Sequence, residues 1–137
     1  MLRGLTTISY WADDVPAAVR WYTEVLGVEP YFARPDAERP AYVEWRIGDY
    51  QHELGVIDRA YAPAGTRQGP GGVVAYWHVD DVEAAVERLL ALGATAHEAP
   101  VDRGEGFITA TVIDPFGNIL GLMYNPHYLE VLGGASR

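Results

Sequence analysis

Residues 13–19 read Asp-Asp-Val-Pro-Ala-Ala-Val, and residues 80–86 read Asp-Asp-Val-Glu-Ala-Ala-Val, 67 positions further along the chain. Shorter matches follow at a shift of 66, with Tyr-Trp at 10–11 and 76–77, Leu-Gly at 26–27 and 92–93, and Leu-Gly again at 54–55 and 120–121. Similarity at a near-constant period indicates a repeated structural unit. The sequence therefore predicts two tandem copies of one supersecondary unit.

Each repeat predicts a βαβββ module. Asp13 or Asp14 in the first repeat and Asp81 in the second are placed to cap a helix, because a carboxylate accepts the unpaired amides of a first turn. Leu-Gly predicts the end of each helix. Segments rich in β-branched and aromatic residues predict the strands, at 6–11, 29–33, 42–47 and 50–57 in the first module and at 73–79, 95–98, 107–113 and 118–124 in the second.

The stretch 58–72 is rich in glycine and proline and predicts the connection between the modules. We expect a single domain over 1–137, with module one at 5–57, the linker at 58–72, module two at 73–125 and a C-terminal tail at 126–137. The tail could cover a sheet edge or contact a partner subunit.

Composition limits the classes of function. The chain has 137 residues, 49% of them hydrophobic and 12% aromatic, which is enough for a packed core with aromatic side chains to spare. A net charge of -9 argues against nucleic acid and anionic membrane surfaces as partners. Without cysteine, disulfides and thiolate metal sites are excluded. Since no segment approaches the roughly 18 apolar residues of a membrane span, we expect a cytoplasmic protein.

Residues 114–118 read Asp-Pro-Phe-Gly-Asn directly before the last predicted strand. Together with Asp-Val at each helix start and Leu-Gly at each helix end, this arrangement resembles the vicinal oxygen chelate superfamily over residues 5–125. That group contains glyoxalases, bleomycin resistance proteins and extradiol dioxygenases. The resemblance implies an α+β fold in which two tandem βαβββ modules form a curved eight-stranded mixed sheet around a central cavity, with the helices outside. It also implies a homodimer.

In metal-dependent members of that superfamily, His, Gln or Glu side chains from the first and last strand of each module hold one divalent ion. The equivalent positions, counted from the helix caps and from the 114–118 turn, are Thr7, Val74, Gly121 and either Gly55 or Glu53. At most one of these side chains is a metal ligand of the kind that Zn²⁺ or Fe²⁺ requires. We therefore expect no metal and no other cofactor, with a divalent metal as the disfavoured alternative.

Strand alternation selects the side chains that would line the cavity. The predicted ligand-binding residues are Thr7, Ser9, Trp11, Gln51, Tyr76 and Gly121. Glu53 and His78 are the candidate catalytic pair, as base and acid, if they meet across the cavity. The alternative for Glu53 is an exposed carboxylate or an ion pair with Arg46 or Arg103.

Three functional hypotheses remain open at this point. The first is a metal-independent cavity of the bleomycin-resistance type that binds a small aromatic or cationic molecule. The second is a lyase, isomerase or dioxygenase of this superfamily that uses Glu53 and His78, with or without a divalent metal. The third is an association module with a collapsed cavity. The sequence does not decide whether the protein is an enzyme.

Overall fold

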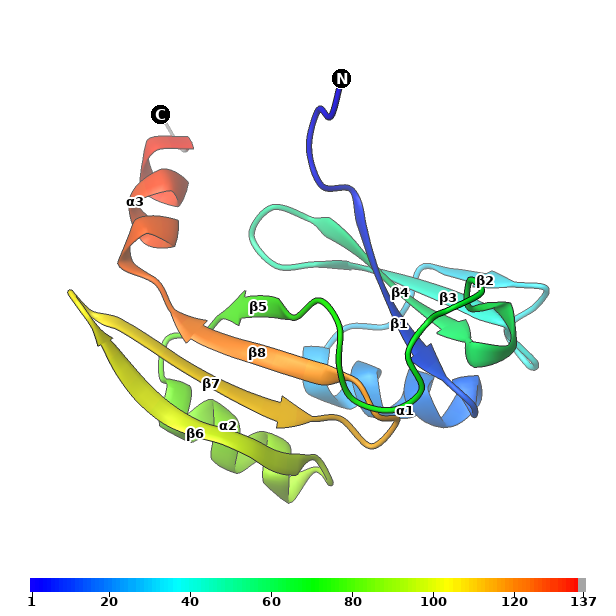
Figure 1. Cartoon of the computed structure of the whole chain (residues 1–137). Coiled ribbons are helices and arrows are strands. Elements are labelled where there is room, and N and C mark those ends of the chain that lie inside the picture. Colours follow the sequence, from blue (N-terminus) through cyan, green and yellow to red (C-terminus); the bar gives the residue numbers. More distant parts are fainter. Residues whose placement is uncertain (136–137) are drawn as a thin grey trace. The chain divides into compact units, whose positions relative to one another are not determined.

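The structure is a computed structural model that describes residues 1–135, and the chain divides into two compact units, Met1–Thr66 and Arg67–Arg137. The first unit has one sheet and one α-helix (Figure 1). Its elements in chain order are β1 (Thr7–Ala12), α1 (Val15–Leu26), β2 (Phe32–Arg34), β3 (Tyr42–Ile47), β4 (His52–Asp58) and a 3-10 turn η1 (Arg59–Tyr61).

The first sheet has the strand order β1-β4-β3-β2, with β1 parallel to β4 and the other pairs antiparallel. α1 packs on β3 and β4. An Asp14 carboxylate oxygen accepts the amide hydrogen of Ala17, and Gly27 ends the helix in the left-handed conformation that glycine adopts most readily. The core between helix and sheet contains the stacked rings of Tyr10 and Tyr22, 5.8 Å apart, and the fully buried Trp45.

The second unit repeats this plan. Its elements are β5 (Ala75–His78), α2 (Val82–Ala91), β6 (Thr95–Gly104), β7 (Phe107–Ile113), β8 (Ile119–Tyr124) and α3 (Pro126–Ala135). The strand order is β5-β8-β7-β6, and α2 packs on β6, β7 and β8 over an aliphatic core. The α+β class and the two βαβββ modules are thus confirmed. Within residues 1–135, the eight strands hydrogen-bond as two four-stranded sheets.

Some details differ from the expectations. The segment after residue 125, which had no assigned structure, forms α3. β6 continues to Gly104, well beyond the expected end at residue 98, and absorbs the extra residues through irregularities in its register with β7. Gln51 was expected on the last strand of the first module, but its φ of 55° places it in the turn before β4.

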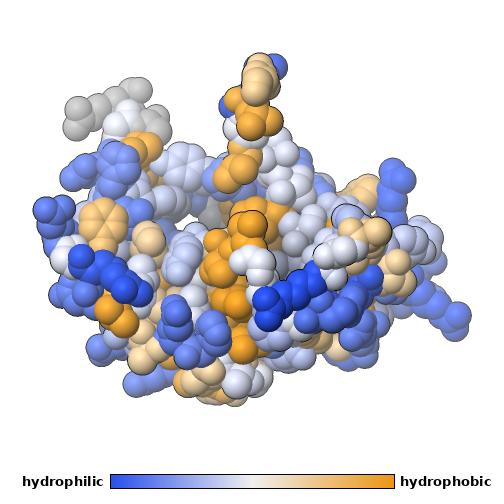
Figure 2. Space-filling model, in the orientation of Figure 1, coloured by the Kyte–Doolittle hydropathy of each residue, from blue (hydrophilic) through white to orange (hydrophobic). Residues whose placement is uncertain are grey.

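No helix among the described residues combines the length and the apolar character that a membrane crossing requires. Hydrophilic side chains cover much of the face shown in Figure 2. The N-terminal segment before β1 carries the exposed hydrophobic side chains Met1, Leu2 and Leu5.

Candidate functional site

Each sheet presents one face to the helix that follows its first strand, α1 or α2. We call the opposite face helix-free because it carries neither of these helices, although α3 contacts it at His78 in the second unit. In the first sheet, Tyr10, Leu54 and Trp45 are buried on the α1 side. Because side chains alternate along a strand, their neighbours point the other way. We call this second surface the first polar face. It consists of Thr7, Ser9 and Trp11 on β1, Glu53, Gly55 and Ile57 on β4, Tyr42, Glu44 and Arg46 on β3, and Phe32 and Arg34 on β2.

Glu53 is held from both sides on this face. The register of the sheet places Thr7, Glu53 and Arg46 side by side on three neighbouring strands. The Thr7 hydroxyl donates to Glu53 Oε2 over 2.6 Å, and Arg46 Nη1 lies 3.4 Å from Glu53 Oε1. The ion pair with Arg46, foreseen as the alternative to a catalytic role, is therefore present. With one partner on each oxygen, Glu53 is a fixed carboxylate that still keeps 29% of its side-chain surface exposed.

Glu44 is a second carboxylate on the same face, two residues from Arg46. It accepts a short hydrogen bond from the Tyr42 hydroxyl. Burial and then the charge of Glu53 raise the pKa of Glu44, whereas Arg46 lowers it. Burial and Glu53 also raise the pKa of Tyr42. The Tyr42 ring lies across Gly55, where a Cβ would come within 2.7 Å of it.

Aromatic rings and guanidinium groups alternate at the β2 side of this face. The Arg46 guanidinium carbon lies 4.9 Å from the centre of the Tyr31 ring, and that of Arg34 lies 5.3 Å from the Phe32 ring. Phe32 also meets the Tyr42 ring edge to face at 6.1 Å. Such contacts are typical of cation–π pairs at exposed sites. The first polar face thus combines two carboxylates, two guanidinium groups and a row of aromatic rings.

The second sheet places a tyrosine on its own helix-free face. Tyr76 pairs in register with Gly121, and a Cβ on Gly121 would come within 2.6 Å of the Tyr76 ring. Tyr76 nevertheless remains 46% exposed. The predicted ligand-binding residues Tyr76 and Gly121 are therefore in contact, as a ring resting on a glycine.

His78 is surrounded by residues of its own unit. Its Nδ1 accepts the amide hydrogen of Asn125 over 3.2 Å, and the Tyr128 ring of α3 stacks on the imidazole at 4.6 Å. Its Nε2 is buried and lies 3.6 Å from Asp80 Oδ1, beyond hydrogen-bond distance. The C-terminal helix therefore covers the imidazole. Glu53 belongs to the first unit and His78 to the second, so the candidate pair is not brought together within either unit.

The remaining predicted residues are distributed as follows. Ser9 pairs with Gly55, and Trp11 pairs with Ile57, both on the first polar face. Gln51 lies in the turn, where its side-chain amide donates to the Gly48 carbonyl over 2.9 Å. His97 Nδ1 lies 2.7 Å from the Thr111 hydroxyl, as a histidine satisfied within its own sheet.

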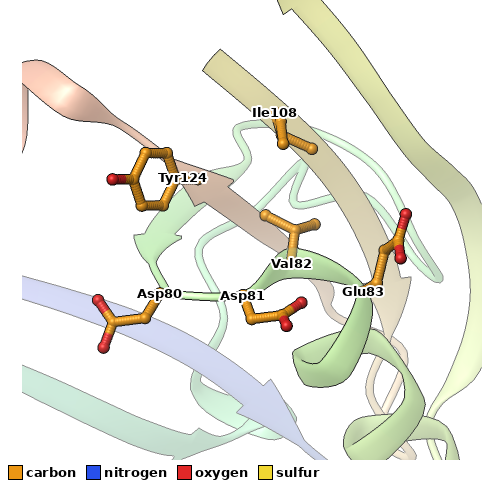
Figure 3. Close-up of a pocket in the computed structure, with 6 residues that line it drawn as sticks. All are labelled: Asp80, Asp81, Val82, Glu83, Ile108 and Tyr124. Carbon is orange, nitrogen blue, oxygen red and sulfur yellow. The ribbon is translucent and has the colours of Figure 1, made fainter. Parts of the chain in front are cut away.

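A hollow of about 280 Å³ lies in the second unit, at the start of α2 (Figure 3). Asp80, Asp81, Val82 and Glu83 line one side of it, and Ile108 and Tyr124 line the other. Asp81 caps α2 by accepting the Ala84 amide hydrogen. Ile108 and Tyr124 lie in register on adjacent strands, on the face that also packs α2. Two of the lining residues also approach His78: Asp80 Oδ1 lies 3.6 Å from its Nε2, and the Tyr124 ring lies 5.5 Å from the imidazole.

The side chains at the superfamily's metal positions do not fit a divalent ion here. Val74 and Gly121 offer no donor atom, the Thr7 hydroxyl donates to Glu53, and Glu53 carries the cationic partner Arg46. Among the described residues, no three His, Cys, Asp or Glu side chains come together as a metal-binding group. The chemistry of the donors therefore disagrees with a metal at this position.

Sequence reasoning missed Tyr42 and Glu44. Both could have been selected from the sequence, because the strand predicted at 42–47 alternates Tyr, Glu and Arg with buried residues. This alternation places all three side chains on one face of the sheet. What the sequence could not show is which strand lies beside β3, and so which carboxylate faces Arg46.

Residues 4–122 match the family model of the Glyoxalase/Bleomycin resistance protein/Dioxygenase superfamily. The chain belongs to this superfamily, as the resemblance implied. Among curated proteins no match is found.

Solved structures with a similar fold share little sequence with the chain. A glyoxalase-related enzyme from Fulvimarina pelagi is 22% identical with a TM-score of 0.72, over 91% of this chain and 90% of that one. A superfamily member from Sphaerobacter thermophilus is 20% identical with a TM-score of 0.70, over 90% and 98%. A lactoylglutathione lyase from Agrobacterium tumefaciens is 23% identical with a TM-score of 0.65, over 92% and 96%. At these identities the likeness concerns the fold alone.

Proposed function

We propose that the protein binds a small planar aromatic cation on the first polar face, without a metal ion. The observation that carries this proposal is the carboxylate of Glu53, fixed by Thr7 and still partly exposed on a face that also bears aromatic rings. A carboxylate beside aromatic surface is the combination that recognises an aromatic cation, because the ring faces and the negative charge attract it together.

Two further observations support a positively charged ligand. Glu44 adds a second carboxylate to the face, where burial and then the charge of Glu53 raise its pKa and Arg46 lowers it. The net charge of the chain, -9, favours the approach of cations over anions. Thr7, Trp11, Tyr42 and Glu53 are the proposed binding residues. The ligand-binding roles of Ser9, Tyr76 and Gly121 stay predictions, as do the homodimer, the cytoplasmic location and the absence of nucleic-acid and membrane partners.

The lyase or isomerase alternative needs His78 as an acid near a substrate. The structure instead surrounds that imidazole with Asn125, Tyr128 and Asp80. A proton relay requires both groups within reach of one substrate. The surroundings of His78 therefore favour binding over acid–base catalysis.

The test compares two dyes of similar shape, the planar cation proflavine and uncharged acridine, in mildly alkaline buffer. We expect the protein to bind proflavine more tightly, and Glu53→Gln to lower that affinity about tenfold, the effect of losing a hydrogen-bonded charge pair. Protein purified without chelator is assayed for metal in parallel. Equal affinity for both dyes, or a stoichiometric metal ion whose removal abolishes binding, would contradict the proposal.

A further inference from the structure

Arg46 contacts two partners at the same time on the first polar face. One of its guanidinium nitrogens lies 3.4 Å from Glu53 Oε1, and the guanidinium carbon lies 4.9 Å from the centre of the Tyr31 ring. Half of the Arg46 side chain is exposed. Since a solvent-exposed ion pair contributes little to stability, the contact with Glu53 can break without disturbing the fold.

Glu53 keeps its position when that contact breaks. Its second oxygen accepts the Thr7 hydroxyl over 2.6 Å, from the neighbouring strand on the other side. Arg46 can meanwhile remain over Tyr31, so neither partner loses all of its contacts. The carboxylate is therefore preorganised to receive a different cation in the place of the guanidinium.

From these contacts, and resting on the proposed function, we infer that Arg46 competes with the ligand for Glu53. Its guanidinium occupies the cation position beside the Glu53 carboxylate, and a ligand cation binds there by breaking this ion pair while Arg46 stays over Tyr31. Arg46 thereby sets the selectivity of the site. A compact metal ion gains too few ligands to displace it, whereas a planar organic cation also gains contact with the rings of the face.

If Arg46 competes with the ligand, removing the Arg46 side chain should strengthen ligand binding. Arg46→Ala should raise the affinity for proflavine about fivefold, since the ligand no longer breaks an ion pair or meets a like charge. Arg46→Met retains the aliphatic stem and should show the same gain if Arg46→Ala folds poorly. Arg46→Lys keeps a competing cation and should stay close to the unmodified protein.

Two controls separate this mechanism from a general change in charge. Arg34→Ala removes the same charge from the same face, where Arg34 rests on Phe32, and should change the affinity by less than about twofold. In a Glu53→Gln background, Arg46→Ala should bring no gain, because the shared carboxylate is gone. Acridine should respond to none of these substitutions at Arg46.

The outcomes distinguish this inference from the function on which it rests. If proflavine binding depends on Glu53 but Arg46→Ala leaves it unchanged or weaker, the competition is refuted while the binding site stands. If the unmodified protein binds no proflavine and Arg46→Ala does, the competition is supported in its strongest form. If neither protein binds proflavine, the inference and the proposed ligand class both fail.

Discussion

Gly55 and Gly121 occupy the same place in the two units, and a tyrosine ring covers each of them from a different side. Tyr76 reaches Gly121 from β5, the strand that pairs in parallel with β8. In the first unit, the residue paired with Gly55 on β1 is the small Ser9, and the ring comes from Tyr42 on β3. Because Tyr42 lies beside Glu44, its hydroxyl meets that carboxylate.

The difference extends across both sheets. On the strand that runs antiparallel to the glycine strand, Gly55 pairs with Glu44 whereas Gly121 pairs with Thr111. The first unit therefore collects charge on its helix-free face. The second unit instead satisfies Thr111 with His97 and covers His78 with α3. One architecture thus carries an ion pair beside aromatic rings in the first copy, and a histidine under α3 in the second. The candidate site is therefore placed in the first unit.

The largest expected effect on stability comes from substitutions in the cores of the two units. Trp45 pairs with Leu54 as Val112 pairs with Leu120, and both Trp45 and Val112 have no exposed surface. Trp45→Ala should lower the free energy of unfolding by about 3–5 kcal/mol, the range for a large buried aromatic. Val112→Ala should lower it by about 1.5–2 kcal/mol, from about 0.8 kcal/mol for each carbon removed.

Urea unfolding followed by circular dichroism measures both losses. Val73→Ala is the matched control, because Val73 is 99% exposed and should contribute nothing measurable. Equal losses of unfolding free energy for Trp45→Ala and Val112→Ala would contradict the prediction that the larger buried side chain contributes more.

An intermediate effect is expected at the two glycines. Gly121→Ala should cost about 1–3 kcal/mol, because the new Cβ meets the base of the Tyr76 ring and the whole ring must rotate. Gly55→Ala meets only the outer end of the Tyr42 ring, which can tilt away, and should cost less. Thermal unfolding of both variants gives the comparison.

Removal of Tyr76 tests whether its ring causes the cost of Gly121→Ala. The double variant Gly121→Ala/Tyr76→Ala should be no less stable than Tyr76→Ala alone, because the clash disappears with the ring. If the alanine remains equally costly in the double variant, the glycine is required by something other than Tyr76.

The smallest effect is a pH dependence of stability that comes from Glu44. The folded-state pKa of Glu44 is raised above its ordinary value, chiefly by burial and then by Glu53. The contribution of a protonated Glu44 to stability is therefore complete below the ordinary glutamate pKa and is lost as the pH rises through the folded-state value. Glu44→Gln should become more stable relative to the unmodified protein as the pH rises through this interval.

Unfolding at a series of pH values, with the difference between the two proteins plotted, measures this dependence. Val73→Ala is the control, because Val73 is 99% exposed and has no titratable group, so this change should shift stability by the same amount at every pH. A constant difference for Glu44→Gln would show that Glu44 ionises in the folded state as it does in the unfolded state.

Much of the fold was readable from the sequence because its signals are local. Asp14, Gly27 and Asp81 delimit helices through contacts within one turn. The repeat indicated the βαβββ order of the elements along the chain. The tail was harder, because α3 is fixed by contacts with His78, far away in sequence. Gln51 was misplaced because a positive φ in a non-glycine residue has no strong sequence signal.

The site was only partly readable for the same reason. Strand alternation correctly placed Thr7 and Glu53 on one face, and their register makes them partners. The role of Glu53 depends on Arg46, whose position follows from the antiparallel pairing of β3 and β4 rather than from any local pattern. The covering of His78 by Tyr128 likewise required the tertiary structure.

The two helices differ in length, with 12 residues in α1 and 10 in α2. The spacing between the copies is 67 at the helix caps, Asp14 and Asp81, and at the core residues Trp45 and Val112, but 66 at Gly55 and Gly121. An ungapped alignment of the two halves therefore superposes Tyr10, which is 7% exposed and faces α1, on Tyr76, which faces the opposite side. Any transfer of a residue's role from one half to the other therefore needs a spacing of 67 on β1 and β3 but of 66 on β4. With a spacing of 66 throughout, every assignment on β1 and β3 falls on the wrong side of the sheet.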